Sequence, residues 1–300
     1  MKLLQLRYLI QLAETGSFTK AATKLNVAQP VLSRQIKQLE QELGVALFRR
    51  NGRGVEPTAA GQELVRRSVT VFQYLSETRE AVTAFLDKAD GEVTIGILPL
   101  FGAAVVPELL LRCRDEHPGL RIKVMVGMSP AVHEWLISGR IDFGVISSSL
   151  ETSKFIKTSR IASDFLHLVY RAEGSTDNNK PITLAKALET ELVIPSRNNG
   201  IGTVIAAIAQ RENIAVKPKI EVDSIEIIKG LILSGVGSTL LPRFAIEREI
   251  RAGLLHSRKV TSPPLEYHLD LATAVEKPLN RNAGIVAEIL RSVSEKVIRP

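Results

Sequence analysis

Residues 27–43, VAQPVLSRQIKQLEQEL, restrict the fold of this chain more than any other stretch. Apolar residues recur here at spacings of four, three and four, which places them on one face of an α-helix. Pro30 suits a first helical turn, where its missing N–H costs no bond, and Gly44 suits the left-handed position that ends a helix. The residues predicted to face inward are Leu32, Ile36, Leu39 and Leu43.

The opposite face of this helix is polar. Its side-chain donors suit phosphate oxygens and the base edges of a DNA major groove. An ordinary surface helix with a solvated polar face shows the same pattern, so the helix alone leaves both interpretations open. The polar residues are Gln29, Ser33, Arg34 and Lys37.

The flanking segments favour the DNA-binding interpretation. Asn26 suits the left-handed end of a preceding short helix, so only a tight turn fits between the two helices, as in a helix-turn-helix. That preceding helix has its own apolar stripe, formed by Phe18, Ala21, Ala22 and Leu25. Downstream, a basic hairpin or wing is predicted where arginines surround turn residues. This stretch contains Arg49, Arg50, Asn51, Gly52, Arg53 and Gly54.

The whole run of residues 17–61 resembles the winged helix-turn-helix signature of LysR-type transcriptional regulators. One departure is Ala28, where many members of that family have a serine that caps the reading helix. The resemblance implies that double-stranded DNA is contacted in the groove by Gln29, Pro30, Ser33, Arg34 and Lys37. It also implies that the wing meets phosphate or the minor groove through Arg50 and Arg53.

The distribution of charge agrees with a polyanionic partner. Residues 1–67 contain eleven Lys or Arg and five acidic residues, a net charge of +6, whereas the whole chain has a net charge of +7. A local positive excess of this kind is the electrostatic footprint of a nucleic-acid-binding segment.

The composition is that of an ordinary globular protein. The chain has 300 residues, enough for two or three cooperating domains, and 45% of them are hydrophobic. No apolar run of about 18 residues is present, so we expect no membrane span. The leucine-rich N-terminus is interrupted by polar residues at helical spacing, which indicates an amphipathic helix over about Leu3–Glu14 and not a signal peptide. The residues of this helix expected to face the core are Leu4, Tyr8 and Leu12. Together with the single cysteine, Cys113, this predicts a cytoplasmic protein.

A long helix is predicted after the wing. Thr58 is a candidate cap, and apolar residues then recur to about Lys88. A helix of about 30 residues would span about 45 Å, which is hard to bury in one small domain. In the resembling family this linker helix forms a dimer seam; a helix packed on its own domain is the alternative.

The rest of the sequence alternates strand and helix patterns, which predicts α/β structure with a mostly parallel sheet. The resemblance completes the predicted fold class: a mainly α N-terminal winged helix-turn-helix with a long linker helix, followed by an α/β two-lobed effector-binding domain like periplasmic binding proteins. Crossovers between the lobes are expected near residues 160–165 and 263–266. The predicted domains are the winged helix-turn-helix (1–58), the linker and dimerisation helix (59–89) and the effector-binding domain (90–300), with lobe I at about 90–162 and 267–300 and lobe II at about 163–266.

By the same resemblance, a small-molecule effector binds between the lobes. The family often has a Ser or Thr at the position of Leu100, so Leu100 and Phe101 at the mouth suggest an effector with an apolar part, such as an aromatic or aliphatic acid. The alternative is that both side chains pack beneath the loop expected at residues 98–101, after the first predicted strand of lobe I. Arg197 is a candidate carboxylate clamp, or else a surface loop charge. The predicted effector contacts are Leu98, Pro99, Leu100, Phe101, Ser147, Ser148, Ser196, Arg197 and Asn198.

No residue pattern proposes catalysis. Gly200–Gly202 and Gly235–Gly237 lack the third glycine of a dinucleotide fingerprint, and the five histidines are scattered singly. We therefore expect no enzymatic activity, no cofactor and no metal. The family resemblance implies a homo-oligomer, either a dimer or a dimer of dimers (a homotetramer), and makes RNA polymerase a further candidate partner. A solute-binding protein and a cytoplasmic α/β enzyme with an added interaction module are the alternatives.

Overall fold

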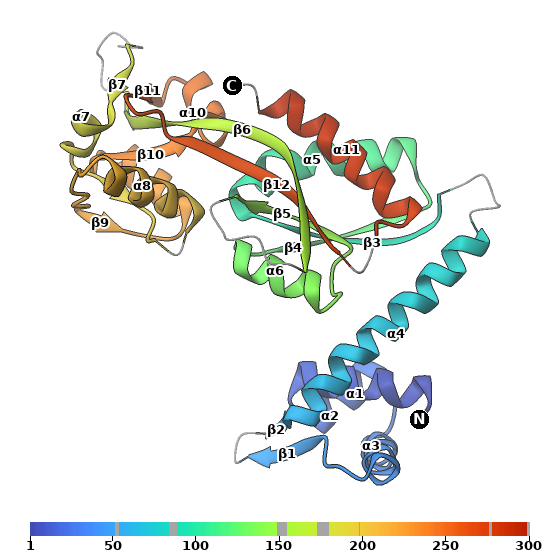
Figure 1. Cartoon of the computed structure of the whole chain (residues 1–300). Helices are drawn as coiled ribbons and strands as arrows, with labels where there is room; N and C mark the ends of the chain where they lie inside the picture. Colours follow the sequence, from blue (N-terminus) through green and yellow to red (C-terminus); the bar gives the residue numbers. More distant parts are fainter. Residues whose placement is uncertain are drawn as a thin grey trace. The chain divides into compact units, whose positions relative to one another are not determined.

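The chain forms two compact units, one of residues 1–85 and another of most of residues 86–300. Figure 1 shows the helical first unit and the α/β second unit. The computed structural model describes residues 1–51, 54–83, 89–148, 155–172, 180–197, 199–275 and 278–298.

Three helices build the core of the first unit: α1 (Leu3–Thr15), α2 (Phe18–Leu25) and α3 (Gln29–Leu43). Both predicted helix ends are confirmed, because Asn26 has φ 53° and Gly44 has φ 68°. Two apolar residues predicted to face the core are on the surface instead: Leu4 is 51% exposed and Leu43 is 42% exposed. The core along α3 ends at Leu39, so the last turn of the helix passes beyond the side chains that would cover it.

The wing and the linker helix follow. Strands β1 (Phe48–Asn51) and β2 (Gly54–Pro57) pair antiparallel, and α4 extends over Ala59–Thr83. The Oγ1 of Thr58 accepts the N–H of Gly61 at 3.1 Å, which confirms the predicted cap. The first turns of α4 pack on the unit's own core through Leu64 and Val65. Farther along, apolar side chains are exposed at Val71, Tyr74, Leu75 and Val82; the predicted end near Lys88 lies outside the described residues.

Lobe I of the second unit begins with two β-α-β steps. Its parallel strands are β3 (Gly91–Ile97), β4 (Leu120–Val126) and β5 (Phe143–Ser147). Its helices are α5 (Pro99–Glu116), α6 (Ser129–Ile137) and the closing helix α11 (Arg281–Val297). The C-terminal helix therefore returns to the lobe where the unit began, and it packs against α5 (Figure 1).

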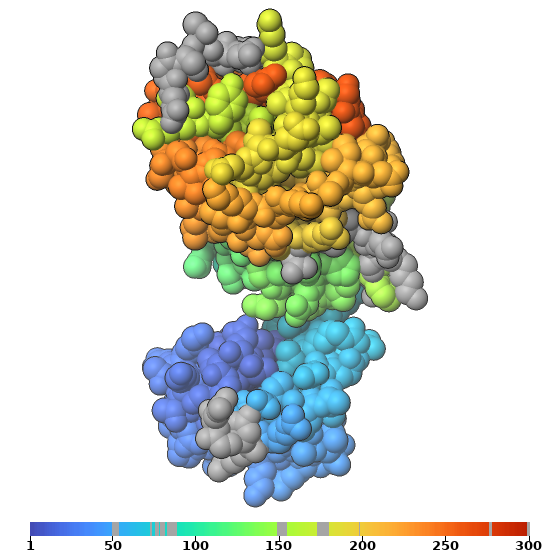
Figure 2. Space-filling model, turned by 90° about the vertical axis from the view of Figure 1, so that its left-hand side faces the viewer, coloured from blue at the N-terminus to red at the C-terminus, as the bar shows by residue number. Residues whose placement is uncertain are grey.

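Lobe II consists of shorter elements, and in Figure 2 its yellow and orange residues face the viewer. Its helices are α7 (Leu184–Leu188), α8 (Gly200–Arg211), α9 (Ile225–Leu233), the 3₁₀ helix η1 (Arg243–Ala245) and α10 (Glu247–Arg251). Its strands are β7 (Ile182–Thr183), β8 (Val193–Ile194), β9 (Ile220–Glu221), β10 (Ser238–Pro242) and β11 (Leu255–Thr261).

A single long strand, β6 (Ile156–Arg171), joins the lobes. Residues 156–165 pair with β12 (Glu266–Ala274) in lobe I, whereas residues 166–171 pair with β10 and β11 in lobe II. The predicted crossover at residues 160–165 is thus continuous strand, and all of these pairs are antiparallel. The expectation of a mostly parallel sheet is therefore wrong, although the predicted two-lobed α/β fold class is confirmed.

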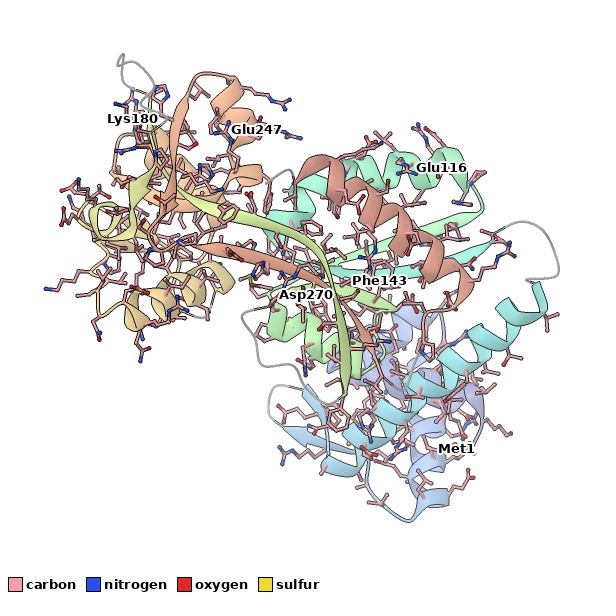
Figure 3. The ribbon with its side chains drawn as sticks, turned by 45° about the horizontal axis from the view of Figure 1, so that its top comes forward. Met1, Glu116, Phe143, Lys180, Glu247 and Asp270 are labelled. Carbon is pink, nitrogen blue, oxygen red and sulfur yellow. The ribbon has the colours of Figure 1, made fainter. Side chains whose placement is uncertain are left out.

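An ionic network ties β6 to β12 where the chain passes between lobes. The Nε of Arg160 donates to Asp270 at 2.6 Å, and the Oγ of Ser148 donates to the same carboxylate at 2.5 Å. Figure 3 places Asp270 on this strand pair. Because Asp270 is only 8% exposed, these bonds satisfy a charge that burial would otherwise penalise.

Candidate functional site

The polar face of α3 is accessible. Gln29, Pro30, Arg34 and Lys37 are exposed and Ser33 is half-buried, while the opposite face is packed in the core. Within the described part of the chain, the side chains of Arg34 and Lys37 form no ion pair or hydrogen bond. Their donors are therefore available to an external acceptor.

Glu40 fixes the wing against α3. Its Oε1 accepts the backbone N–H of Leu47 at 2.8 Å and that of Phe48 at 3.2 Å, which sets the start of β1. A groove of about 230 Å³ lies between helix and wing, with Ser33 and Lys37 on one wall and Arg49 on the other. Of the predicted wing contacts, the side chain of Arg50 and all of Arg53 lie outside the described residues.

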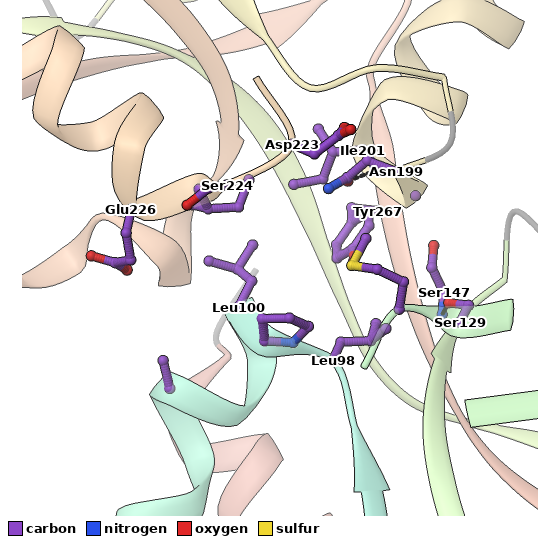
Figure 4. Close-up of a pocket in the computed structure, with 15 residues that line it drawn as sticks. Leu98, Leu100, Ser129, Ser147, Asn199, Ile201, Asp223, Ser224, Glu226 and Tyr267 are labelled. Atoms are coloured by element: carbon purple, nitrogen blue, oxygen red, sulfur yellow. Dashed lines mark hydrogen bonds between the residues drawn. The ribbon is translucent and has the colours of Figure 1, made fainter. Parts of the chain in front are cut away.

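A second candidate site is a cavity of about 370 Å³ between the two lobes (Figure 4). Its volume is in the range typical of small-molecule sites. Lobe I lines it with the first turns of α5 and α6, including Leu98, Pro99, Leu100, Ala103 and Ser129. Strand ends contribute Ser147 and Tyr267, and lobe II contributes Asn199, Gly200, Ile201, Asp223, Ser224, Ile225 and Glu226.

The lobe I side of this cleft has a neutral polar floor. The Oγ of Ser129 accepts the backbone N–H of Ser147 at 3.0 Å. The side chain of Ser147 bonds the phenol of Tyr267, which is only 4% exposed. Burial raises the pKa of Tyr267 to about 12, more than the bond from Ser147 lowers it, so the phenol stays protonated at neutral pH.

The lobe II side carries the acidic residues. Asp223 Oδ1 accepts the backbone N–H of Ser196 at 3.0 Å and its Oγ–H at 2.8 Å. Glu226 is exposed in the first turn of α9. Among the described residues, the lining includes these two carboxylic acids and no Lys, Arg or His.

Several helices begin at this cleft, and in two of them a side chain caps one N-terminal N–H group. The Oδ1 of Asn199 accepts the N–H of Ile201 at 3.0 Å in α8, and the Oγ of Ser224 accepts that of Ile227 at 3.4 Å in α9. Ser224 is therefore both the cap of α9 and a lining residue. Pro99 opens α5 without an N–H to offer.

The predicted effector contacts fall into three groups. Leu98, Pro99, Leu100 and Ser147 line the cleft. Four others do not, and Ser148 is one of them: Phe101 is fully buried in the core, Arg197 is exposed, and Ser196 donates its hydroxyl to Asp223. Ser148 is used by the Asp270 network, and Asn198 lies outside the described residues.

The split between Leu100 and Phe101 has a helical cause. The expected loop at residues 98–101 is the first turn of α5, so consecutive side chains point about 100° apart. Leu100 therefore faces the cleft and Phe101 faces the core, and the idea that both stand at the mouth is wrong for Phe101.

Ser129 and Tyr267 were missed by sequence reasoning. Ser129 follows a strand and opens a helix, a position that could have marked it. Tyr267 lies within β12 and has no local signal, because its place at the cleft depends on the pairing of β12 with distant strands.

Within the described ranges, no helix is long and apolar enough to cross a membrane, and no group of three or more His, Cys, Asp or Glu side chains is placed to hold a metal ion.

Comparison with known proteins matches both units. Residues 3–62 match the family model for bacterial regulatory helix-turn-helix proteins of the lysR family, and residues 86–295 match the LysR substrate binding domain. The nitrogen assimilation regulatory protein nac of Klebsiella aerogenes is 28% identical, covering 98% of this chain and 95% of its own length. The transcriptional regulator BbuR of Bordetella bronchiseptica is 27% identical, covering 96% and 88%.

Solved structures share the fold. A full-length OxyR variant from Pseudomonas aeruginosa aligns with a TM-score of 0.79 at 21% identity, covering 100% of this chain and 97% of that one. Full-length CbnR in complex with its target DNA aligns with a TM-score of 0.69 at 20% identity, covering 99% and 100%.

Proposed function

This chain belongs to the LysR family of transcriptional regulators, and we propose which of its residues meet DNA and what class of effector its cleft accepts. The predicted family and regulatory function are confirmed by the two family matches. The α3 face would contact bases and phosphates through Gln29, Pro30, Ser33, Arg34 and Lys37, with the wing, including Arg50 and Arg53, beside it. The exposed donors of Arg34 and Lys37, which have no partner among the described residues, carry this assignment.

Arg34 is the best single test of the reading face. An arginine that donates two bonds to a guanine edge contributes about 1–3 kcal/mol of discrimination. We expect Arg34→Ala to weaken operator binding by that amount and to relax sequence preference at one position. Fluorescence anisotropy measures both quantities on a DNA fragment from upstream of the protein's own gene, once footprinting has located the bound site in it. Arg121→Ala removes an exposed arginine from β4 and serves as the charge-matched control. Unchanged affinity and preference in Arg34→Ala would remove this residue from the groove.

The cleft favours an effector with an apolar body and an uncharged or positively charged polar group. Leu98, Pro99 and Leu100 supply the apolar wall, whereas Asp223 and Glu226 place negative charge on the other side. A carboxylate effector, expected from the sequence, would meet these acids, and no cation lines the cleft in the part of the chain that the structure describes. The caps of α8 and α9 each already use one N–H group of their helix, which reduces the number of donors that these N-termini can offer an anion.

A matched ligand series tests the charge preference of the cleft. Benzylamine and benzamide are expected to bind at least about tenfold more tightly than benzoate, since only benzoate brings a further negative charge to the acidic wall. Glu226→Gln should narrow this difference, while Glu212→Gln, which neutralises an exposed acid outside the lining, should not. Isothermal titration calorimetry gives the affinities. Benzoate binding most tightly would contradict the assignment.

The exposed apolar face of α4 supports a homodimer. Its exposed Val71, Tyr74, Leu75 and Val82 form an apolar surface that a second copy of the helix would cover, giving a homodimer. A dimer of dimers and contact with RNA polymerase extend this proposal by family analogy. We also propose that the protein acts in the cytoplasm, where its DNA is, without catalysis or a cofactor.

A further inference from the structure

A second cavity, of about 620 Å³, lies where the two lobes join and is lined by a different set of residues from the cleft. We call it the hinge cavity. Strand β6 forms part of its wall with Asp164, Phe165 and His167. Lobe II adds Arg243, Phe244, Glu247, Arg251 and Lys259, and the end of α11 in lobe I adds Lys296 and Val297. Figure 3 marks Glu247 in lobe II.

The hinge cavity is strongly basic. Its lining contains four cations, Arg243, Arg251, Lys259 and Lys296, and two acids, Asp164 and Glu247. Burial lowers the pKa of His167 to about 4, with Arg243 and Lys259 acting in the same direction, so this histidine is neutral at pH 7. The lining therefore has a net charge of +2 before any ligand binds.

The two acids are already occupied by the protein. Asp164 accepts the backbone N–H of Phe165 at 2.7 Å and that of Phe244 at 3.0 Å, which anchors η1 to β6. Glu247 accepts the Nε–H of Arg243 at 3.0 Å and that of Arg251 at 2.9 Å. These bonds orient the two guanidinium groups and leave the terminal nitrogens of Arg251 without a partner among the described residues.

The charges of the two lysines are not neutralised by an acid among the described residues. The Nζ of Lys259 lies 3.4 Å from the centroid of the Phe165 ring, a cation–π contact that holds the ammonium without neutralising it. Lys296 is exposed and pairs with no acid within the described ranges. Beside them, the Nδ1 of His167 is shielded from solvent and has no hydrogen-bond partner in the described structure. The hinge cavity is thus lined by cations and by a polar atom that has no hydrogen-bond partner among the described residues.

We propose that the hinge cavity is a second ligand site, for a small multivalent oxyanion such as a phosphate ester or a polycarboxylate. Guanidinium and ammonium donors from β11, α10, η1 and α11 suit the several oxygens of such an anion. The ligand would bridge Lys296 of lobe I to Arg251 and Lys259 of lobe II. It would therefore favour the lobe arrangement in which these cations are closest, which gives it a route to regulation that is separate from the cleft.

Inorganic pyrophosphate, titrated into the full-length protein by calorimetry at constant ionic strength, tests the site. We expect one pyrophosphate per chain in this site and at least a tenfold loss of affinity in Lys296→Gln, which changes an exposed residue and should fold normally. The double variant Lys259→Gln/Lys296→Gln should lose more. Arg248→Gln is the matched control, because it removes an exposed cation of α10 that does not line the cavity.

The cleft must be separated from the hinge cavity in the same experiment. Ala103→Trp places a bulky ring in the cleft and should leave pyrophosphate binding unchanged. The proposal is overturned if pyrophosphate does not bind, if both lysine variants bind it as tightly as wild type, or if Arg248→Gln weakens it equally, since binding would then reflect general charge. None of these outcomes depends on which effector occupies the cleft.

Discussion

Raising the salt concentration from about 50 to about 200 mM is expected to weaken operator binding by this regulator about 10³-fold or more. Each phosphate neutralised by Lys or Arg releases a counterion, and a protein with about 6–10 phosphate contacts loses about 10³–10⁵ in affinity over this range. A dimer would present two copies of the exposed cations near α2, α3 and the wing. These are Lys20, Lys24, Arg34, Lys37 and Arg49.

The measurement is the slope of log affinity against log salt, obtained by fluorescence anisotropy. Lys37→Gln should make the slope shallower by about 2 in the dimer, since one phosphate contact per subunit is lost. Arg114→Gln, on α5 and already paired with Asp115 at 2.7 Å, should leave the slope unchanged. A slope near zero would show that phosphate contacts are not the main source of affinity and would refute the electrostatic assignment.

Local signals explain why the DNA-binding unit was predictable. Asn26 and Gly44 end their helices through backbone conformations that few other residues adopt cheaply, and such preferences act without tertiary context. Glu40 was not predictable in this way. Its bonds to Leu47 and Phe48 exist only once the chain has turned back after α3, so the charge looks like any other on a surface helix until the wing is placed.

The second unit shows where sequence patterns stop being sufficient. The alternation of strands and helices predicted two α/β lobes, but not that β6 would run unbroken through both. Its change of partners, from β12 to β10 and β11, is a property of strand pairing across about a hundred residues of sequence. The cleft depends on the same pairing. Tyr267 therefore lines the cleft although no local sequence pattern predicts it.

The two cavities of this unit differ in charge, and that difference has a consequence for regulation. Among the described residues, the cleft is lined by two acids and no cation, whereas the lining of the hinge cavity has a net positive charge. Two ligands that differ in charge, an anion in the hinge cavity and a neutral or cationic ligand in the cleft, would therefore bind to the same pair of lobes without competing for one site. Each ligand shifts the lobe equilibrium only by its differential affinity for the two arrangements, so any change that one ligand makes in the affinity for the other is reciprocal.

Phe101→Ala is expected to destabilise the effector-binding unit by about 3–5 kcal/mol, the usual cost of removing a fully buried aromatic ring and leaving a cavity. The ring is 0% exposed and packs in the core shared by α5 and the central sheet. Leu100→Ala, one residue earlier, should cost markedly less stability because this half-buried side chain faces the cleft, but it should weaken binding of apolar ligands. Urea unfolding followed by circular dichroism gives the free energies, and calorimetry gives ligand affinity. Equal destabilisation by both variants, or loss of ligand binding in a stably folded Phe101→Ala protein, would contradict the assignment of one side chain to the core and the other to the cleft.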